Sequence, residues 1–258
     1  MGLSSVQSQR VEDILRSGLR HKLDNYKPEP NSMPFHTRLL GTDRLALFSF
    51  IHSLNTNFGT SIFEPIAVEL AKSRFKSASS QVIAGKKMSS DSQIEIQRIM
   101  DKLATAESEP NKLEEIEKIR HVCQSGHMVS VKPTKVDLIV EDYSGGFYLF
   151  DLKTAKPNSG NFKEFKRTLL EWVATRLGEN SKCVIYTGIA IPYNPYAPKP
   201  YNRWTMRGML DLRHELMVAE EFWNFLGGDG VYEDLLDTFE KVGLELRPEI
   251  DAAFARFR

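Results

Sequence analysis

The sequence predicts an α/β protein in which a small mixed β-sheet is flanked by helices. Two short β-rich runs, 136–140 and 147–152, are separated by the turn-forming cluster 141–146, which predicts a β-hairpin. The apolar run 183–191 does not alternate with polar residues, as expected of a strand buried on both faces in the centre of a sheet. Apolar residues at helical spacing elsewhere predict the helices that cover this sheet.

The part of the chain before the hairpin is predicted to be mainly helical. Residue 26 to residue 34 carries three prolines and is expected to be a loop. The stretch 77–90, rich in serine and lysine, is expected to be a loop or a mobile flap. A short strand is expected at 128–131. The predicted helices cover residues 6–23, 45–54, 61–73, 91–106 and 110–124.

After the hairpin, a helix is predicted over 161–177, and the tail 211–254 is expected to be mostly helical. Phe222, Trp223 and Phe225 are the predicted core anchors of this tail. The proline-rich stretch 192–203 is expected to have little regular structure.

Composition limits the function classes. The chain has 258 residues and is 41% hydrophobic, enough for a sizeable core. Net charge is zero, but residues 210–258 hold 12 acidic and 5 basic residues, so the rest carries the positive excess. A basic cleft is therefore compatible with a neutral protein. Cys123 and Cys183 lack zinc spacing and are expected to be free thiols.

Three residues on the hairpin carry the predicted chemistry. Asp137 opens the first strand, and Asp151 and Lys153 stand two residues apart at the end of the second. A period of two places Asp151 and Lys153 on one face, with Leu152 on the other, and hairpin pairing can bring Asp137 beside Asp151. Two converging carboxylates repel each other unless a cation lies between them.

This arrangement predicts a magnesium site. Magnesium favours oxygen ligands and keeps several waters, one of which can attack a phosphodiester. Lys153 can orient that water or offset charge on the phosphate. The alternative is a strand-edge acid beside an exposed Asp151–Lys153 ion pair, because D-x-K alone is a common pattern. The apolar strand before Asp151 and the basic segment after Lys153 favour the metal site.

The motif resembles that of the PD-(D/E)xK nucleases. The stretch 151–172 resembles type II restriction endonucleases of the TdeIII kind, and the likeness extends to 203–205 and 220–227. The family implies a magnesium-dependent cut at a short palindrome of the GGNCC type. The sequence departs from the textual motif at Asp137, which follows Val136, with the proline four residues upstream.

The resemblance implies a homodimer on double-stranded DNA, because a palindrome needs two equivalent half-site readers. A cognate DNA methyltransferase is expected in the same system. The chain is expected to be one nuclease domain, 1–258, with a helical part (about 1–125), a catalytic core (about 126–210) and a helical C-terminal part (about 211–258). Asp137, Asp151 and Leu152 are assigned to the metal, and Asp137, Asp151, Lys153 and Glu64 to catalysis.

Glu64 enters this set because a further acid often joins such sites from an upstream helix. Glu69 is the second candidate. The alternative for Glu64 is a capping box, in which its side chain reaches back to the amide of Ser61. The alternative for Glu69 is a solvated helix face. The two glutamates lie too far apart around a helix to share one metal.

Basic and amide side chains follow the motif. Positions 163, 166 and 167 share one helical face, so phosphate contact and a solvated polar face are both open. Amides and guanidiniums can also read base edges. The predicted DNA-binding residues are Lys156, Asn158, Lys163, Lys166, Arg167 and Arg203.

Two rival hypotheses remain. One is a repair or recombination nuclease of the same fold, which would need damage or a junction in its DNA. The other is a DNA-binding protein that does not cut, which an intact Asp137, Asp151 and Lys153 disfavours. The first residues contain no continuous apolar stretch, so no signal peptide is expected and the cytoplasm is the predicted location.

Overall fold

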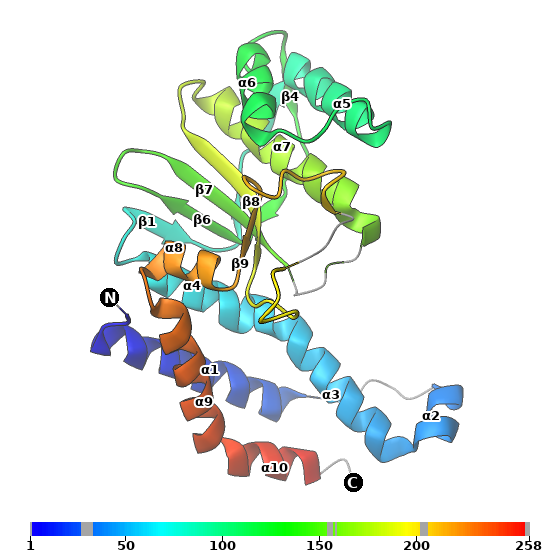
Figure 1. Cartoon of the computed structure of the whole chain (residues 1–258), viewed down its shortest axis with the longest axis vertical. Helices are drawn as coiled ribbons and strands as arrows, with labels where there is room; N and C mark the ends of the chain where they lie inside the picture. Colours follow the sequence, from blue (N-terminus) through cyan, green and yellow to red (C-terminus); the bar gives the residue numbers. More distant parts are fainter. Residues whose placement is uncertain (1, 27–32, 154–156, 158, 202–205, 256–258) are drawn as a thin grey trace.

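The computed structural model describes residues 2–26, 33–153, 157, 159–201 and 206–255. Its central element is a five-stranded mixed sheet in the order β1-β6-β7-β8-β9 (Figure 1). β6 runs antiparallel to β1 and β7, whereas β7, β8 and β9 are parallel. The predicted small mixed sheet is confirmed. Its strands are β1 (Ser77–Ser79), β6 (Leu138–Glu141), β7 (Phe147–Leu152), β8 (Ile185–Ile191) and β9 (Leu216–Val218).

The predicted hairpin is the pair β6–β7. Leu138 pairs with Phe150 and Glu141 with Phe147. In the turn, Asp142 Oδ1 accepts hydrogen bonds from the backbone N–H groups of Ser144 and Gly146 at 2.8 Å each. The acidic and glycine-rich cluster therefore fixes the turn, and the turn fixes which residues of the two strands face each other.

A helix connects the parallel strands β7 and β8, as parallel neighbours require. α7 (Phe162–Glu179) confirms the predicted helix and buries Leu169, Trp172 and Val173 against the sheet. β8 has β7 on one side and β9 on the other, and five of its residues are buried in a row, as the unbroken apolar run predicted.

The helices form two groups, one on each side of the sheet (Figure 1). α7 packs on one face together with α5 and α6, while α4 and α8 line the other and α1 and α9 lie outside them. These helices are α1 (Ser5–Asn25), α4 (Glu64–Ala71), α5 (Ser90–Ala104), α6 (Lys112–Val122), α8 (Glu220–Gly227) and α9 (Val231–Glu245). The remaining helices are α2 (Pro34–Leu40), α3 (Thr42–Phe58), α10 (Arg247–Ala255) and a 3-10 turn, Ser159–Asn161.

Two expectations about local structure are wrong. The segment expected as a loop or flap holds β1 and two shorter strands, because each finds a partner strand far away in the sequence. β2 (Val82–Ile83) pairs with β5 (Lys135–Val136), and β3 (Lys87–Ser89) pairs with β4 (Met128–Ser130). The helix start predicted at residue 61 is also wrong, because α3 runs through a π-helical segment, Gly59–Phe63, into α4, and the alternative role of Glu64 in a capping box with Ser61 is therefore absent.

The C-terminal part differs from expectation in one strand. β9 interrupts the predicted helical tail and adds an edge to the sheet. Phe222 and Trp223 are buried as predicted, and Phe225 packs partly buried against the same core. Within the described residues, no helix is both long and apolar enough to cross a membrane.

Candidate active site

The hairpin places Asp137 and Asp151 side by side. Asp137 lies between β5 and β6, directly before Leu138, and Asp151 lies in β7, directly after Phe150. Because Leu138 pairs with Phe150, the register sets the two aspartates opposite each other. Asp137 Oδ2 accepts a hydrogen bond of 2.9 Å from the backbone N–H of Leu152, which fixes the carboxylate against the end of β7.

Lys153 completes this group. Its Nζ lies 2.6 Å from Asp151 Oδ1, which agrees with the same-face geometry of residues two apart in an extended chain. The ammonium group also lies 4.7 Å from the centre of the Phe165 ring at the start of α7. The lysine is therefore held between the strand that carries the acid and the helix that follows.

Asp151 is the most perturbed acid of the site. Burial, which leaves it 8% exposed, and to a lesser degree the neighbouring Asp137 raise its pKa, the ion pair with Lys153 opposes the shift, and the net pKa is about 7. A carboxyl group in this state gains from any additional cation close to it, since the cation favours the ionised form.

Glu64 enters the same site from the first residue of α4. The residue is 3% exposed, and burial raises its pKa, while a hydrogen bond from Gln81 opposes that shift. Gln81 Nε2 donates to both Glu64 oxygens, at 3.0 and 2.9 Å, and to Asp137 Oδ1 at 3.2 Å. The π-helical segment leads directly into α4 and places the Glu64 carboxylate beside Asp137. Glu64 does not cap a helix.

Glu69 lies elsewhere. Its carboxylate forms ion pairs with Arg10 at 2.7 Å and with Lys72 at 2.6 Å. Glu69 is buried, and its carboxylate is neutralised by Arg10 of α1 and by Lys72, so the structure does not bring it to Asp137 and Asp151. Of the two glutamates left open by the sequence, Glu64 is the one that joins the aspartates.

A pocket of about 580 Å³ opens beside this group. Its lining includes Glu64, Asp137 and Lys153, together with Leu152. The other lining residues come from α3 and the π-helical segment and from the proline-rich stretch after β8: His52, Asn55, Phe58, Gly59, Thr60, Phe63, Pro192, Tyr193 and Pro195. The site thus has room for a ligand next to its acids and its lysine.

Gln81 and the α3 wall were not predicted from the sequence. Gln81 belongs to the segment expected as a loop, and a glutamine carries no metal or acid–base signal of its own. Among the described residues, no three His, Cys, Asp or Glu side chains are already grouped as a metal cage. The oxygens of Glu64, Asp137 and Asp151 bond instead to Gln81, the Leu152 amide and Lys153.

The predicted basic face of α7 is divided by the fold. Lys163 is exposed, and Arg167 donates to Gln97 Oε1 at 2.7 Å. Lys166 is fully buried, with Nζ 2.5 Å from Glu115 and 2.7 Å from Glu215. A fully buried lysine that is paired with two glutamates cannot contact a DNA phosphate, so the predicted phosphate contact of Lys166 is wrong. The predicted DNA-binding residues Lys156, Asn158 and Arg203 lie outside the described residues.

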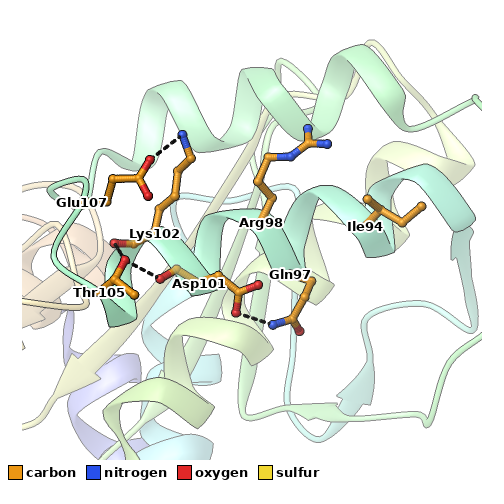
Figure 2. A pocket seen from close by; sticks show the side chains of 7 residues that line it. All are labelled: Ile94, Gln97, Arg98, Asp101, Lys102, Thr105 and Glu107. Carbon is orange, nitrogen blue, oxygen red and sulfur yellow. Dashed lines mark hydrogen bonds and ion pairs between the residues drawn. The ribbon is translucent and has the colours of Figure 1, made fainter.

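A second hollow, of about 520 Å³, lies along α5 (Figure 2). Its polar side chains pair with one another: Lys102 with Glu107 at 3.2 Å, and Gln97 with Asp101 at 2.7 Å. The hollow borders none of the acids described above. It therefore has no part in the candidate site.

Comparison with known proteins agrees with this architecture. A family model described as "Type II restriction endonuclease, HinfI" matches residues 3–243. The type II restriction enzyme HgiCII of Herpetosiphon aurantiacus is 25% identical over 238 residues, which cover 89% of this chain and 86% of the relative. HgiEI of the same organism is 22% identical, covering 97% and 98%. MjaII of Methanocaldococcus jannaschii is 25% identical, covering 77% and 55%.

These relatives define the class of protein: a type II restriction enzyme, that is, a site-specific deoxyribonuclease. The chain belongs to the HinfI family of type II restriction endonucleases. The resemblance to type II restriction endonucleases on the residues after Asp151 is thereby confirmed, and the match extends over nearly the whole chain.

Proposed function

We propose that the chain hydrolyses phosphodiester bonds of double-stranded DNA with Mg²⁺ bound at Asp137, Asp151 and Leu152. The donor set fits this ion, because Mg²⁺ prefers oxygen ligands and the site offers carboxylates. Leu152 would contribute its main-chain oxygen, the only ligand atom that a leucine has for a hard cation. The raised pKa of Asp151 supports the same assignment, because a carboxyl group that is buried beside a second acid is stabilised by a cation.

Bound Mg²⁺ would supply positive charge to the phosphate and make an attacking water more acidic. The other steps belong to the chain. Lys153 offsets the charge that develops on the phosphate, and its contact with Asp151 holds it at the reacting group. Glu64 faces the same pocket and provides a carboxylate that can accept a proton from the water.

The observation that carries the proposal is the convergence of acids from separate elements. Glu64 comes from α4, Asp137 from the start of β6 and Asp151 from β7, and Lys153 joins them at the end of the same strand. A fold does not gain stability by gathering buried acids, because each raises the cost of ionising the others. Such a cluster beside a pocket is typical of a catalytic site.

The wider assembly follows from the resemblance. A homodimer acting on a short palindrome, of the GGNCC type, gives each half-site one equivalent subunit. Lys163 and Arg167 remain the proposed phosphate contacts on α7. A cognate methyltransferase in the same system would protect the host DNA.

Digestion of unmodified plasmid DNA, followed by sequencing of the ends, tests this function. We expect discrete fragments whose ends share one short palindrome, produced with Mg²⁺ and not in EDTA. Cleavage only at junctions or lesions would assign the chain to a repair function instead. Binding of duplex DNA without any cleavage in Mg²⁺ would overturn the catalytic proposal.

A further inference from the structure

Gln81 lies directly across from Asp137 in an interrupted antiparallel ladder. On one side of the interruption Ser79 pairs with Ile139, and on the other Val82 pairs with Val136. Both pairings have the same register, so extending either one sets Gln81 opposite Asp137. Side chains opposite each other in antiparallel strands lie on the same face and within contact distance. The backbone therefore aims the Gln81 amide at the acidic group.

The interruption is maintained by an unusual backbone at Gln81. Its φ is +56°, a region that residues other than glycine, asparagine and aspartate rarely adopt. Strained conformations of this kind persist where surrounding interactions hold them, and they are concentrated at functional sites. At Gln81 the interactions are the three hydrogen bonds of one amide nitrogen with the oxygens of Glu64 and Asp137.

The Gln81 amide donates to carboxylate oxygens of Glu64 and Asp137 that would otherwise face each other. Asp137 uses one oxygen for the Leu152 amide and the other for Gln81. Glu64, which is buried, has both oxygens on Gln81. Without a donor between them, the buried carboxylate of Glu64 and the partly buried carboxylate of Asp137 would face each other and repel. Mg²⁺ at the proposed site would need Asp137 Oδ1, the oxygen to which Gln81 donates, because Oδ2 already accepts from the Leu152 amide.

We propose that Gln81 is a positioning residue that holds Glu64 beside Asp137, and that its bond to Asp137 Oδ1 competes with Mg²⁺ for that oxygen and is released when Mg²⁺ binds. The inference rests on the proposed Mg²⁺ site and adds an exchange step to it. Gln81 then stabilises the metal-free state more than the metal-bound state. Removal of the Gln81 amide raises the free energy of the metal-free protein. The binding equilibrium therefore shifts toward the metal-bound protein, and the apparent affinity for Mg²⁺ increases.

Two substitutions have opposite expected effects on Mg²⁺ binding. Gln81→Leu keeps a side chain of similar length but removes the donor, so the metal-free protein loses stability and Mg²⁺ binds about 10-fold more tightly, as expected for loss of a hydrogen bond to a charged group. Gln81→Lys places a cation between the carboxylates, so the metal-free protein is stabilised and Mg²⁺ binds more weakly. If Gln81 had only a structural role, its substitution would lower the free energy of unfolding equally with and without the metal, and Mg²⁺ affinity would not change.

The experiment is a titration of the full chain with MgCl₂ in the absence of DNA. Calorimetry measures Mg²⁺ binding, and the thermal midpoint measures the stability that binding adds. Gln9→Leu is the matched control, because the Gln9 amide also donates to a carboxylate, Asp13, at 2.9 Å on an exposed helix face. It should leave the Mg²⁺ response unchanged.

Tighter binding in Gln81→Leu and weaker binding in Gln81→Lys would support the exchange. Weaker binding in Gln81→Leu would make Gln81 a ligand and overturn it, as would equal binding in wild type and both variants. If Gln81→Leu does not fold, the Gln81→Lys titration decides alone: unchanged or tighter binding contradicts the exchange. A wild type with no Mg²⁺ response would overturn the metal site and the exchange together, whereas a failure confined to the variants leaves the metal site standing.

Discussion

At Asp151 the chain buries an ionisable group beside a second acid. Its pKa lies at about 7 in the folded protein, against 3.8 for an ordinary aspartate, so the folded state holds this proton more tightly than the unfolded state. The free energy of unfolding therefore falls as pH rises from about 4 to about 7, because the unfolded chain releases the proton first.

Asp151→Asn should remove this dependence, since an amide does not ionise. In EDTA above pH 7 the variant should be more stable than the wild type, by up to about 4 kcal/mol, while its cleavage activity is lost. Urea unfolding between pH 4.5 and 8 measures the difference. Two stability profiles that run parallel across this range would show that Asp151 is not held in the protonated form by its surroundings.

Lys166 is a single residue whose role was predicted incorrectly from the sequence. Its position on α7 beside Lys163 and Arg167 predicted a shared basic face, but its partners, Glu115 and Glu215, lie about 50 residues away on either side. Glu215 also binds the buried Lys112 at 2.9 Å, so four charges neutralise one another between α6, α7 and the start of β9. No local pattern reveals an ion-pair network whose members come from distant elements.

Among the elements, the continuous helix from α3 through the π-helical segment to α4 decides the role of Glu64. Glu64→Gln should lower cleavage by at least about 100-fold, because the charge is lost in the pocket, and should not lower stability, because burial already disfavours that charge. Single-turnover cleavage and the thermal midpoint are the paired measurements.

Glu69→Gln is the matched control on the same helix. It loses ion pairs with Arg10 and Lys72, so its expected effect is a loss of stability of about 1 kcal/mol or less with normal cleavage. Normal cleavage by Glu64→Gln, or a loss of cleavage confined to Glu69→Gln, would remove Glu64 from the site.

The strands show how far element prediction reaches. β6 and β7 were predicted from two short β-rich runs on either side of a turn-forming cluster, and β8 from an unbroken apolar run, all of which are local features of the sequence. β1, β2 and β3 are two or three residues long and have polar neighbours, so their strand character depends on partners across the fold. Gln81 was missed for this reason, because only the register of β2 with β5 sets it opposite Asp137.

At the scale of the whole molecule, the sheet combines segments that the sequence analysis had separated. β1 comes from the predicted helical N-terminal part, β6, β7 and β8 from the predicted core, and β9 from the predicted helical C-terminal part. The fold class and the grouping of Asp137, Asp151 and Lys153 could be predicted, because they depend on one hairpin. Glu64 was ranked ahead of Glu69 from the sequence, with its capping role left open, but the pocket wall from α3 could not be predicted, because it depends on how distant helices pack on the sheet.

Cleavage by Asp137→Asn, measured together with DNA binding, tests the central proposal that this site cuts DNA with a bound metal. Under single-turnover conditions with Mg²⁺ and DNA that carries the recognition site, we expect a loss of at least about 1,000-fold in rate. We expect affinity for the same DNA to be retained, because removing a carboxylate lowers repulsion toward phosphate. Cleavage by Asp137→Asn at the wild-type rate in Mg²⁺ would contradict the proposed site.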